Sequence, residues 1–306
     1  MRIVIFCTLI SGLVSLSEAA ELIAPQSATG VEGNSYQIPL DTGGPQRFQQ
    51  VYSSSLFSDF TQGILIDEID FRGDAFVGHG FISTVSNIEI HLSTTSKAPD
   101  GLSPVFDDNV GMDDRIVVGR DPFLLRGAGG GRVVGPWSVY FYLDPNPFFY
   151  DPSRGNLLLD IKVFSGASTA PFDAVDITGD SVSSVFAYDR TLPSIGQPSS
   201  LGLATRFVFQ PVPELIVFLQ STNLLFRWIN RPSGFMLQQS PVLGLGATWQ
   251  IASGMATTNG AYKKVTLPLD PQVAARFFRL VLPFSPSGTA GLPSNSEATD
   301  LSNQER

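Results

Sequence analysis

The sequence has almost no cysteine. Of its 306 residues only Cys7 is a cysteine, and it lies in an apolar segment at the start of the chain. The rest of the chain therefore has no thiol, which excludes disulfide bonds, thiolate catalysis and zinc sites built on cysteine. The stability of such a chain must come from packing alone, which favours a large hydrophobic core.

Charged residues are also few. They make up 15% of the chain, against roughly 25% in typical soluble domains. The 19 Lys and Arg residues are scattered without forming a run, and the net charge is −9. Because phosphate contacts need clustered basic side chains, this balance argues against a nucleic-acid partner.

Long hydrophobic runs are absent beyond the first residues. Arg2 gives a positive start, and the apolar stretch 3–14 that follows is too short to span a bilayer. Ser17 and Ala19 place small residues at the positions that determine cleavage. We therefore expect a signal peptide over residues 1–19, no transmembrane segment in the mature chain, and a protein that is secreted or held at the cell surface or in the periplasm.

Glycine (29 residues), proline (22) and phenylalanine (23) are abundant instead, which is typical of a turn-rich β-protein. Short strand-like segments recur without an amphipathic helix between them. The pattern predicts an all-β protein, with a jelly-roll-like β-sandwich over 34–210 and a smaller antiparallel β-domain over 211–283. The stiff junction Pro211-Val-Pro-Glu214 separates them. We expect a flexible leader over 20–33 and a disordered tail over 284–306.

One predicted strand, Gly63–Arg72, changes its pattern halfway. Ile64 and Ile66 are candidates for the core in its first half, and Ile69 and Phe71 in its second half. The apolar positions switch from even to odd numbers, so one residue must be accommodated outside the regular alternation. This switch predicts a β-bulge near the acidic pair at 67–68.

Candidate metal ligands concentrate in the loop after a predicted strand over Ser83–Thr94. They are Asp107, Asp108, Asn109, Asp113 and Asp114. Calcium takes roughly six to eight oxygen ligands, which carboxylates and loop carbonyls can supply. The spacing does not fit an EF-hand loop and lacks its distal Glu, and Asp and Asn also favour turns for local reasons. A calcium site and a solvated turn both stay open, and we predict no other cofactor.

Motifs of nucleophilic catalysis are missing. His79 and His91 are the two histidines, and no Gly-x-Ser-x-Gly turn accompanies them. The glycine-rich stretch Arg126–Arg132 lacks the Lys-Ser/Thr ending of a phosphate-binding loop and precedes no predicted helix. We therefore interpret it as a flexible loop.

Paired carboxylates are the remaining route to an enzyme. Asp67, Glu68 and Asp70 lie on one predicted strand, and Asp107 or Asp160 could provide a second acid for a glycosidase. The alternative is that acids of this kind, on strands of an exported β-protein, are simply solvated.

Aromatic residues suggest a binding surface. Trp137, Tyr140, Tyr142, Phe149 and Tyr150 lie close together in the sequence, and ring faces can pack on the apolar faces of sugars while polar neighbours bind the hydroxyls. The alternative is that Trp137 and half of the others belong to the core.

Four short motifs resemble a group of exported bacterial β-sandwich proteins that often carry a PEP-CTERM sorting tail. The motifs are Phe48–Phe57, Ile88–Thr95, Pro99–Ser103 and Gly155–Ile161. The resemblance covers roughly residues 34–210 and implies an exported or surface-associated protein with no assigned catalytic activity. The sorting tail itself is not matched, because Leu215 rather than proline follows Val212-Pro-Glu. Residues 212–283 resemble instead the small C-terminal β-domain found on many exported bacterial proteins.

Two hypotheses follow from the sequence. The first is an exported, non-enzymatic protein that binds a carbohydrate or another envelope polymer, or has a structural role there. The second is a polysaccharide hydrolase or lyase that uses carboxylates on a jelly-roll face.

Overall fold

The computed structural model describes residues 19–281, except for 41–44, 61–62, 120–121, 144–145, 167–168, 190, 231–233, 245, 260–261 and 271–274. The predicted tail, and the predicted signal peptide apart from its last residue, lie outside the described residues. The chain divides between Glu214 and Leu215 into two compact units, at the end of the proline-containing junction. Each unit is described by itself.

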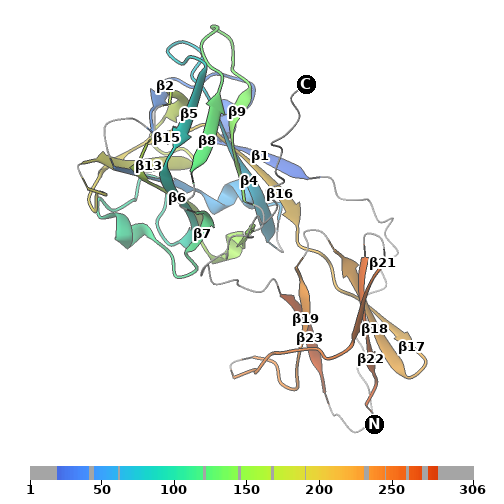
Figure 1. Cartoon of the computed structure of the whole chain (residues 1–306). Coiled ribbons are helices and arrows are strands. Elements are labelled where there is room, and N and C mark those ends of the chain that lie inside the picture. The colour runs from blue at the N-terminus through green and yellow to red at the C-terminus, as the bar shows by residue number, and fades with distance from the viewer. Residues whose placement is uncertain are drawn as a thin grey trace, which may run out of the picture. The chain divides into compact units, whose positions relative to one another are not determined.

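The described chain is all-β, as the sequence predicts. Its helical segments are 3-10 turns of three or four residues, namely η1 (Gln26–Ala28), η2 (Ser54–Phe57), η3 (Phe106–Asn109) and η4 (Pro152–Arg154). The strands form several antiparallel sheets (Figure 1). This arrangement fits a sandwich without specifying the strand order of a jelly roll.

Two large sheets build the first unit. Sheet A has the order β1-β16-β4-β10, and β9 also pairs with β4. Its strands are β1 (Ala20–Ala24), β16 (Thr205–Pro211), β4 (Ile64–Arg72), β10 (Phe148–Tyr150) and β9 (Trp137–Tyr142). Sheet B consists, in order, of β14 (Gln197–Ser199), β13 (Val182–Tyr188), β3 (Gln46–Tyr52), β11 (Asn156–Ser165), β6 (Asn87–Thr95) and β7 (Arg115–Val118).

Two smaller sheets complete this unit. A three-stranded sheet consists of β15 (Leu201–Leu203), β12 (Phe172–Asp176) and β2 (Ser35–Gln37). A two-stranded sheet pairs β5 (Phe81–Val85) with β8 (Phe123–Gly127).

The core of the first unit contains side chains from both large sheets. Sheet A contributes Ile66 and Phe207, and sheet B contributes Tyr52 and Leu159, all fully buried in one cluster. The Tyr52 and Phe207 rings meet edge to face with their centroids 4.8 Å apart, a favoured arrangement for aromatic pairs. Alternate residues of these strands therefore face the core, and the others form the outer faces of the two sheets.

The predicted bulge in β4 is confirmed. Val208 of β16 is paired with Glu68, but the next residue, Phe209, is paired with Ile66. Asp67 is thus the extra residue, and its presence lets Ile66 and Ile69 both face the core. The same insertion turns Glu68 to the outer face of sheet A.

The expected flexible leader over 20–33 is wrong for its first part. Ala20–Ala24 form β1, which pairs along its whole length with β16, and Ala24 is fully buried in the core. Five residues are too few to show a reliable alternation in the sequence, so partnership with β16 rather than local pattern determines this strand.

The strand expected over Ser83–Thr94 is two strands. β5 pairs with β8, whereas β6 pairs with β11 and β7. Ser86 separates them and donates its amide hydrogen to the carbonyl of Gly166 at 3.3 Å. The chain thus passes from the two-stranded sheet into sheet B at this residue.

The second unit contains two small antiparallel sheets, as expected for the region after the junction. One consists of β17 (Ile216–Gln220), β18 (Asn223–Ile229), β22 (Tyr262–Pro268) and β21 (Met255–Asn259). The other consists of β20 (Gln250–Ile251), β19 (Met236–Ser240) and β23 (Phe277–Val281). Phe226, Trp228 and Leu237 are among its buried residues. Within the described ranges of the whole chain, no helix has the length and apolarity needed to cross a membrane.

Candidate functional site

The aromatic residues singled out in the sequence lie along one edge of sheet A. β9 and β10 both pair with β4. In this register Tyr140 is opposite Asp70 and Tyr142 is opposite Glu68. Side chains directly opposite each other in antiparallel strands point to the same face. Both tyrosines therefore share the outer face of sheet A with two carboxyl groups.

The five predicted aromatic residues differ in exposure. Tyr142 is 61% and Tyr140 37% exposed, and their rings are nearly parallel, with centroids 6.2 Å apart and planes at 17°. Phe149 on β10 is 40% exposed. Tyr150 is fully buried, and its hydroxyl donates to the carbonyl of Gly155 at 2.8 Å. Tyr150 thus belongs to the core, and the other three rings are accessible.

Trp137 is half-buried at the start of β9. Its ring lies near two guanidinium groups, 5.0 Å from that of Arg72 and 5.7 Å from that of Arg206. It also packs against a small apolar cluster of Ala28, Val175 and Ala204. Trp137 therefore supports the surface more than it exposes a free ring. We call the outer surface formed by Trp137, Tyr140, Tyr142 and Phe149 the aromatic face.

A shallow groove of about 250 Å³ lies between β8 and β9, the neighbouring strands labelled in Figure 1. Its lining comprises Phe123, Leu124, Leu125, Arg126, Ser138, Tyr140 and Tyr142. The Phe123 ring stacks on the buried Phe141 ring of β9 with centroids 5.3 Å apart, and Ser138 Oγ accepts the amide hydrogen of Ala128 at 2.9 Å. These contacts fix β8 against β9, so the groove is a built feature of the aromatic face.

Charged groups continue the aromatic face toward β16 and β1. Arg206 donates from Nε to Asp70 Oδ2 at 2.8 Å and from Nη1 to Glu21 Oε2 at 3.3 Å. Asp70 is fully buried, and its Oδ1 accepts no hydrogen bond from a donor in the described part of the chain. Its second neighbour is the carboxyl group of Glu68, which affects its acidity.

This environment changes the acidity of two groups. The pKa of Asp70 is raised to about 7, chiefly by burial; Arg206 opposes the rise, and the neighbouring Glu68 carboxyl group adds to it. A raised pKa means that Asp70 takes up a proton at a higher pH than an ordinary aspartate does. The pKa of the Tyr142 phenol is also raised, chiefly by the negative charge of Glu68, which indicates a negative potential at the exposed hydroxyl.

The acidic loop, for which the sequence leaves a calcium site and a solvated turn both open, uses its side chains to attach itself to sheet B. Asp107 pairs with Arg47 at 2.9 Å, and Asp108 accepts a hydrogen bond from a serine hydroxyl of the same loop. Asn109 is buried and donates from Nδ2 to Gln49 Oε1 at 3.0 Å. These oxygen atoms are directed to different partners.

The second half of the loop behaves in the same way. Asp113 accepts a hydrogen bond from a β6 amide at 2.6 Å, and Asp114 Oδ2 lies 3.0 Å from His91 Nδ1. His91 Nε2 in turn lies 3.3 Å from both Glu89 and Lys162. Within the described residues, Asp107, Asp108, Asn109, Asp113 and Asp114 do not supply a group of three carboxylates close enough to share one ion.

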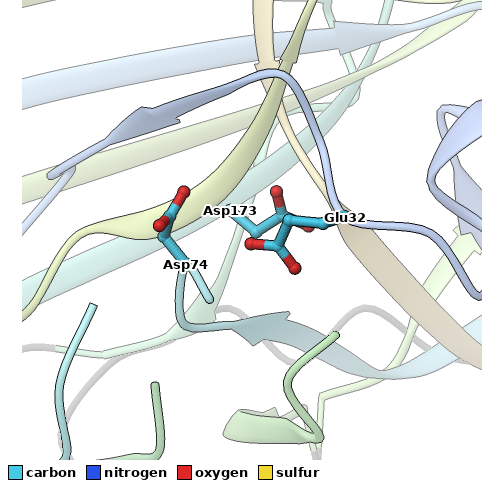
Figure 2. Close-up of side chains that lie close together, drawn as sticks. All are labelled: Glu32, Asp74 and Asp173. Carbon is cyan, nitrogen blue, oxygen red and sulfur yellow. The ribbon is translucent and has the colours of Figure 1, made fainter. Parts of the chain in front are cut away.

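The described residues bring such a group together elsewhere. Glu32, Asp74 and Asp173 each offer one carboxylate oxygen, and these three atoms lie within 4.8 Å of one another. Figure 2 shows the Glu32 and Asp173 carboxyl groups side by side, with Asp74 next to them. Arg72 donates from Nε to Asp173 Oδ2 at 2.6 Å, and the amide of Ala75 donates to Glu32 Oε1 at 2.6 Å.

Charge in this acidic cluster is incompletely balanced. Three carboxylates face one guanidinium, and Glu32 Oε2 is buried with no hydrogen-bond partner in the described part of the chain. Burial is the first cause of the raised pKa of both Glu32 and Asp173, and repulsion from neighbouring carboxylates adds to it. The cluster can relieve this repulsion by taking up a proton or by holding a hard cation such as calcium, whose oxygen ligands lie about 2.3–2.6 Å from the ion.

The glycine-rich loop is adjacent to the cluster and does not form an anion site. The amide of Gly130 donates to the carbonyl of Asp74 at 3.0 Å, and that of Gly131 donates to the carbonyl of Ala75 at 3.1 Å. These two amides are therefore already engaged with backbone oxygen atoms and are not available to cradle a phosphate.

Sequence reasoning missed the acidic cluster because its members come from three separate places. Glu32 precedes β2, Asp74 follows β4, and Asp173 lies within β12. The one local signal is Asp173, a charged residue inside the otherwise apolar run Phe172–Val175. Comparison of the chain with family models, curated proteins and solved structures finds no match, so its function must be argued from these sites.

Proposed function

We propose that this chain is an exported, non-enzymatic protein that binds a carbohydrate through the aromatic face. The observation that carries the proposal is the parallel, exposed pair Tyr140 and Tyr142 beside a groove. Ring faces pack on the apolar faces of sugars, and nearby polar groups fix the hydroxyls. Export is supported by the predicted signal peptide and by the resemblance of residues 34–210 to exported β-sandwich proteins.

The enzyme hypothesis has less support. Glycosidases hold two carboxyl groups roughly 5–9.5 Å apart on either side of the bond they cleave, whereas Asp70 is fully buried and paired with Arg206 at 2.7 Å. Asp107 and Asp160 both bind Arg47, at 2.9 and 2.7 Å, so a guanidinium already occupies the space between them. These arrangements favour binding over hydrolysis.

The test is glycan binding by the whole chain on an array that holds neutral, amino and acidic oligosaccharides. We expect the variant Tyr140→Ala/Tyr142→Ala to bind the best probe at least about fivefold more weakly, because each lost ring removes about 0.5–1.5 kcal/mol of stacking. Tyr188→Ala is the matched control, since Tyr188 is 72% exposed but lies on β13 of sheet B.

Three outcomes would count against the proposal. They are an array without signal, equal weakening by the control and the double variant, and a double variant that binds as well as the unmodified chain. Melting midpoints of all three proteins establish that each is folded.

A further inference from the structure

The charges on the aromatic face do not cancel. Arg206 lies between Glu21 and Asp70 and pairs with both, so one cation already serves two carboxyl groups. Glu68 is a third carboxyl group on the same face, opposite Tyr142. The Tyr142 end of the face is therefore negative.

A basic residue lies on the other wall of the groove. Arg126 of β8 lines the groove together with Ser138 and Tyr140. Arg126 is exposed, and its guanidinium provides hydrogen-bond donors suited to hydroxyl groups. Ser138 donates its hydroxyl hydrogen to the carbonyl of Ala128 at 3.5 Å, and its oxygen can accept from a ligand hydroxyl. The groove thus offers two tyrosine ring faces and hydrogen-bonding groups along its length. Its Tyr142 end lies next to the negative charge of Glu68.

Three ligand classes can be compared against this arrangement. A neutral sugar gains the ring contacts but nothing from Glu68. A sugar with carboxylate or sulfate groups meets repulsion from Glu68 and from a chain of net charge −9. A sugar with a free ammonium group gains the ring contacts, an ion pair with a carboxylate, and attraction of the cation to the electron-rich tyrosine faces.

We infer that the ligand of the aromatic face is an amino sugar polymer with free, positively charged amino groups. This inference rests on the proposed carbohydrate function and specifies its substrate class. Tyr140 and Tyr142 hold the ring of the sugar, Glu68 pairs with its ammonium group, and Arg126 and Ser138 bind its hydroxyls.

The experiment compares three soluble probes of equal length by calorimetric titration of the whole chain at about pH 6, where amines are charged. The probes are glucosamine oligomers, N-acetylglucosamine oligomers and galacturonate oligomers. We expect the glucosamine oligomers to bind at least about tenfold more tightly than the acetylated ones. Added salt should reduce this preference, because it screens exposed charges.

Equal or tighter binding of the acetylated or acidic oligomers would overturn the inference while leaving the carbohydrate function intact. If none of the three probes binds and the glycan array is also blank, the proposed function itself is rejected.

Glu68→Gln locates the preference on the protein. It should abolish the preference for free amines and leave binding of any acetylated probe unchanged. Glu214→Gln is the matched control, because Glu214 is an exposed glutamate at the chain junction, and it should keep the full preference. A Glu68→Gln protein that is folded by its melting midpoint and retains the preference contradicts the assignment. If that variant does not fold, the salt dependence of the unmodified chain decides, and a preference that added salt leaves unchanged contradicts it.

Discussion

Sheets A and B each turn one face away from their common core, and these two outer faces differ in what covers them. On sheet B, Arg47, Gln49, His91 and Asp160 are nearly inaccessible, because the loop that follows β6 is attached over them. On sheet A, Tyr140 and Tyr142 stay exposed at the edge. The sequence concentrates acidic residues in the loop that covers sheet B, and these residues attach the loop to the sheet. The accessible surface is the aromatic one on sheet A.

The largest expected effect concerns the covered face of sheet B. Arg47 donates to Asp160 from Nε at 3.0 Å and from Nη2 at 2.7 Å, and Asp160 is 2% exposed. Arg47→Ala leaves that carboxylate buried without its guanidinium partner, and Lys162 Nζ, 3.8 Å away, is a weaker substitute, so the change should cost about 3 kcal/mol in urea unfolding. Arg126→Ala, at an exposed site on β8, should change stability by less than about 0.5 kcal/mol. A loss below about 1 kcal/mol for Arg47→Ala would mean that water reaches Asp160 on the covered face of sheet B.

The attachment of the loop should depend strongly on Asn109. Its Oδ1 accepts the amide hydrogen of Ser103 at 2.8 Å, and its Nδ2 donates to Gln49. Asn109→Ala leaves buried partners unsatisfied and should cost about 1–3 kcal/mol, measured in the same way. Asp108→Ala is the control, since Asp108 lies at the surface of the same turn and should cost much less. Equal costs would show that the loop is not held by its buried amide.

Asp70, on the outer side of sheet A, should make the stability of the protein depend on pH. The pKa of Asp70 in the folded protein, about 7, is above its ordinary value of 3.8. Between these values the folded state binds more protons than the unfolded state, so stability falls as pH rises through this window. Asp70→Asn cannot titrate and should remove part of that fall in melting midpoints recorded from about pH 4 to 8. The slopes due to Glu32 and Asp173, whose pKa values are also raised, should remain. An unchanged profile in Asp70→Asn would mean that the pKa of Asp70 is not raised in the folded protein.

A smaller effect is expected at the acidic cluster. Glu32→Gln keeps an acceptor for the amide of Ala75 and removes one of three mutually repelling carboxylates. It should raise stability at neutral pH in chelator by roughly 0.5–1 kcal/mol. Calcium offsets the same repulsion only in the unmodified chain, so its addition should raise that melting midpoint and reduce the difference between the two proteins. A lower midpoint for Glu32→Gln in chelator would show that Arg72 already balances the cluster.

Long alternating patterns predicted that strands are present but did not always give their bounds. The bulge of β4 follows from the switch in parity of its apolar residues after Ile66. A similar switch, from Val85 to Ile88, accompanies the break at Ser86, yet a single strand was predicted across it. β1 is too short to show a pattern.

The candidate sites show the same limit. Residues two apart on one strand, such as Tyr140 and Tyr142, can be assigned to one face from the sequence. Which face is covered depends on a loop that returns from elsewhere, so the accessibility of the aromatic residues and the burial of Tyr150 could not be derived. The acidic cluster forms where three segments that are distant in the sequence meet, so the sequence gives even less indication of it than of the aromatic face.

The bulge at Asp67 makes the effect of a deletion depend on its exact position in β4. Asp67 is the residue outside the regular pairing, so its deletion would place Glu68 directly after Ile66 and leave Ile69 and Phe71 on the core side, because side chains alternate with a period of two. Deletion of Asp70 has no such solution, since it either turns Phe71 outward or carries Glu68 into the core. We therefore expect soluble expression to survive deletion of Asp67 and to be lost on deletion of Asp70, and equal yields would contradict this. A natural relative that retains this binding face can therefore lack the residue at 67, but it should keep the spacing from Glu68 to Phe71.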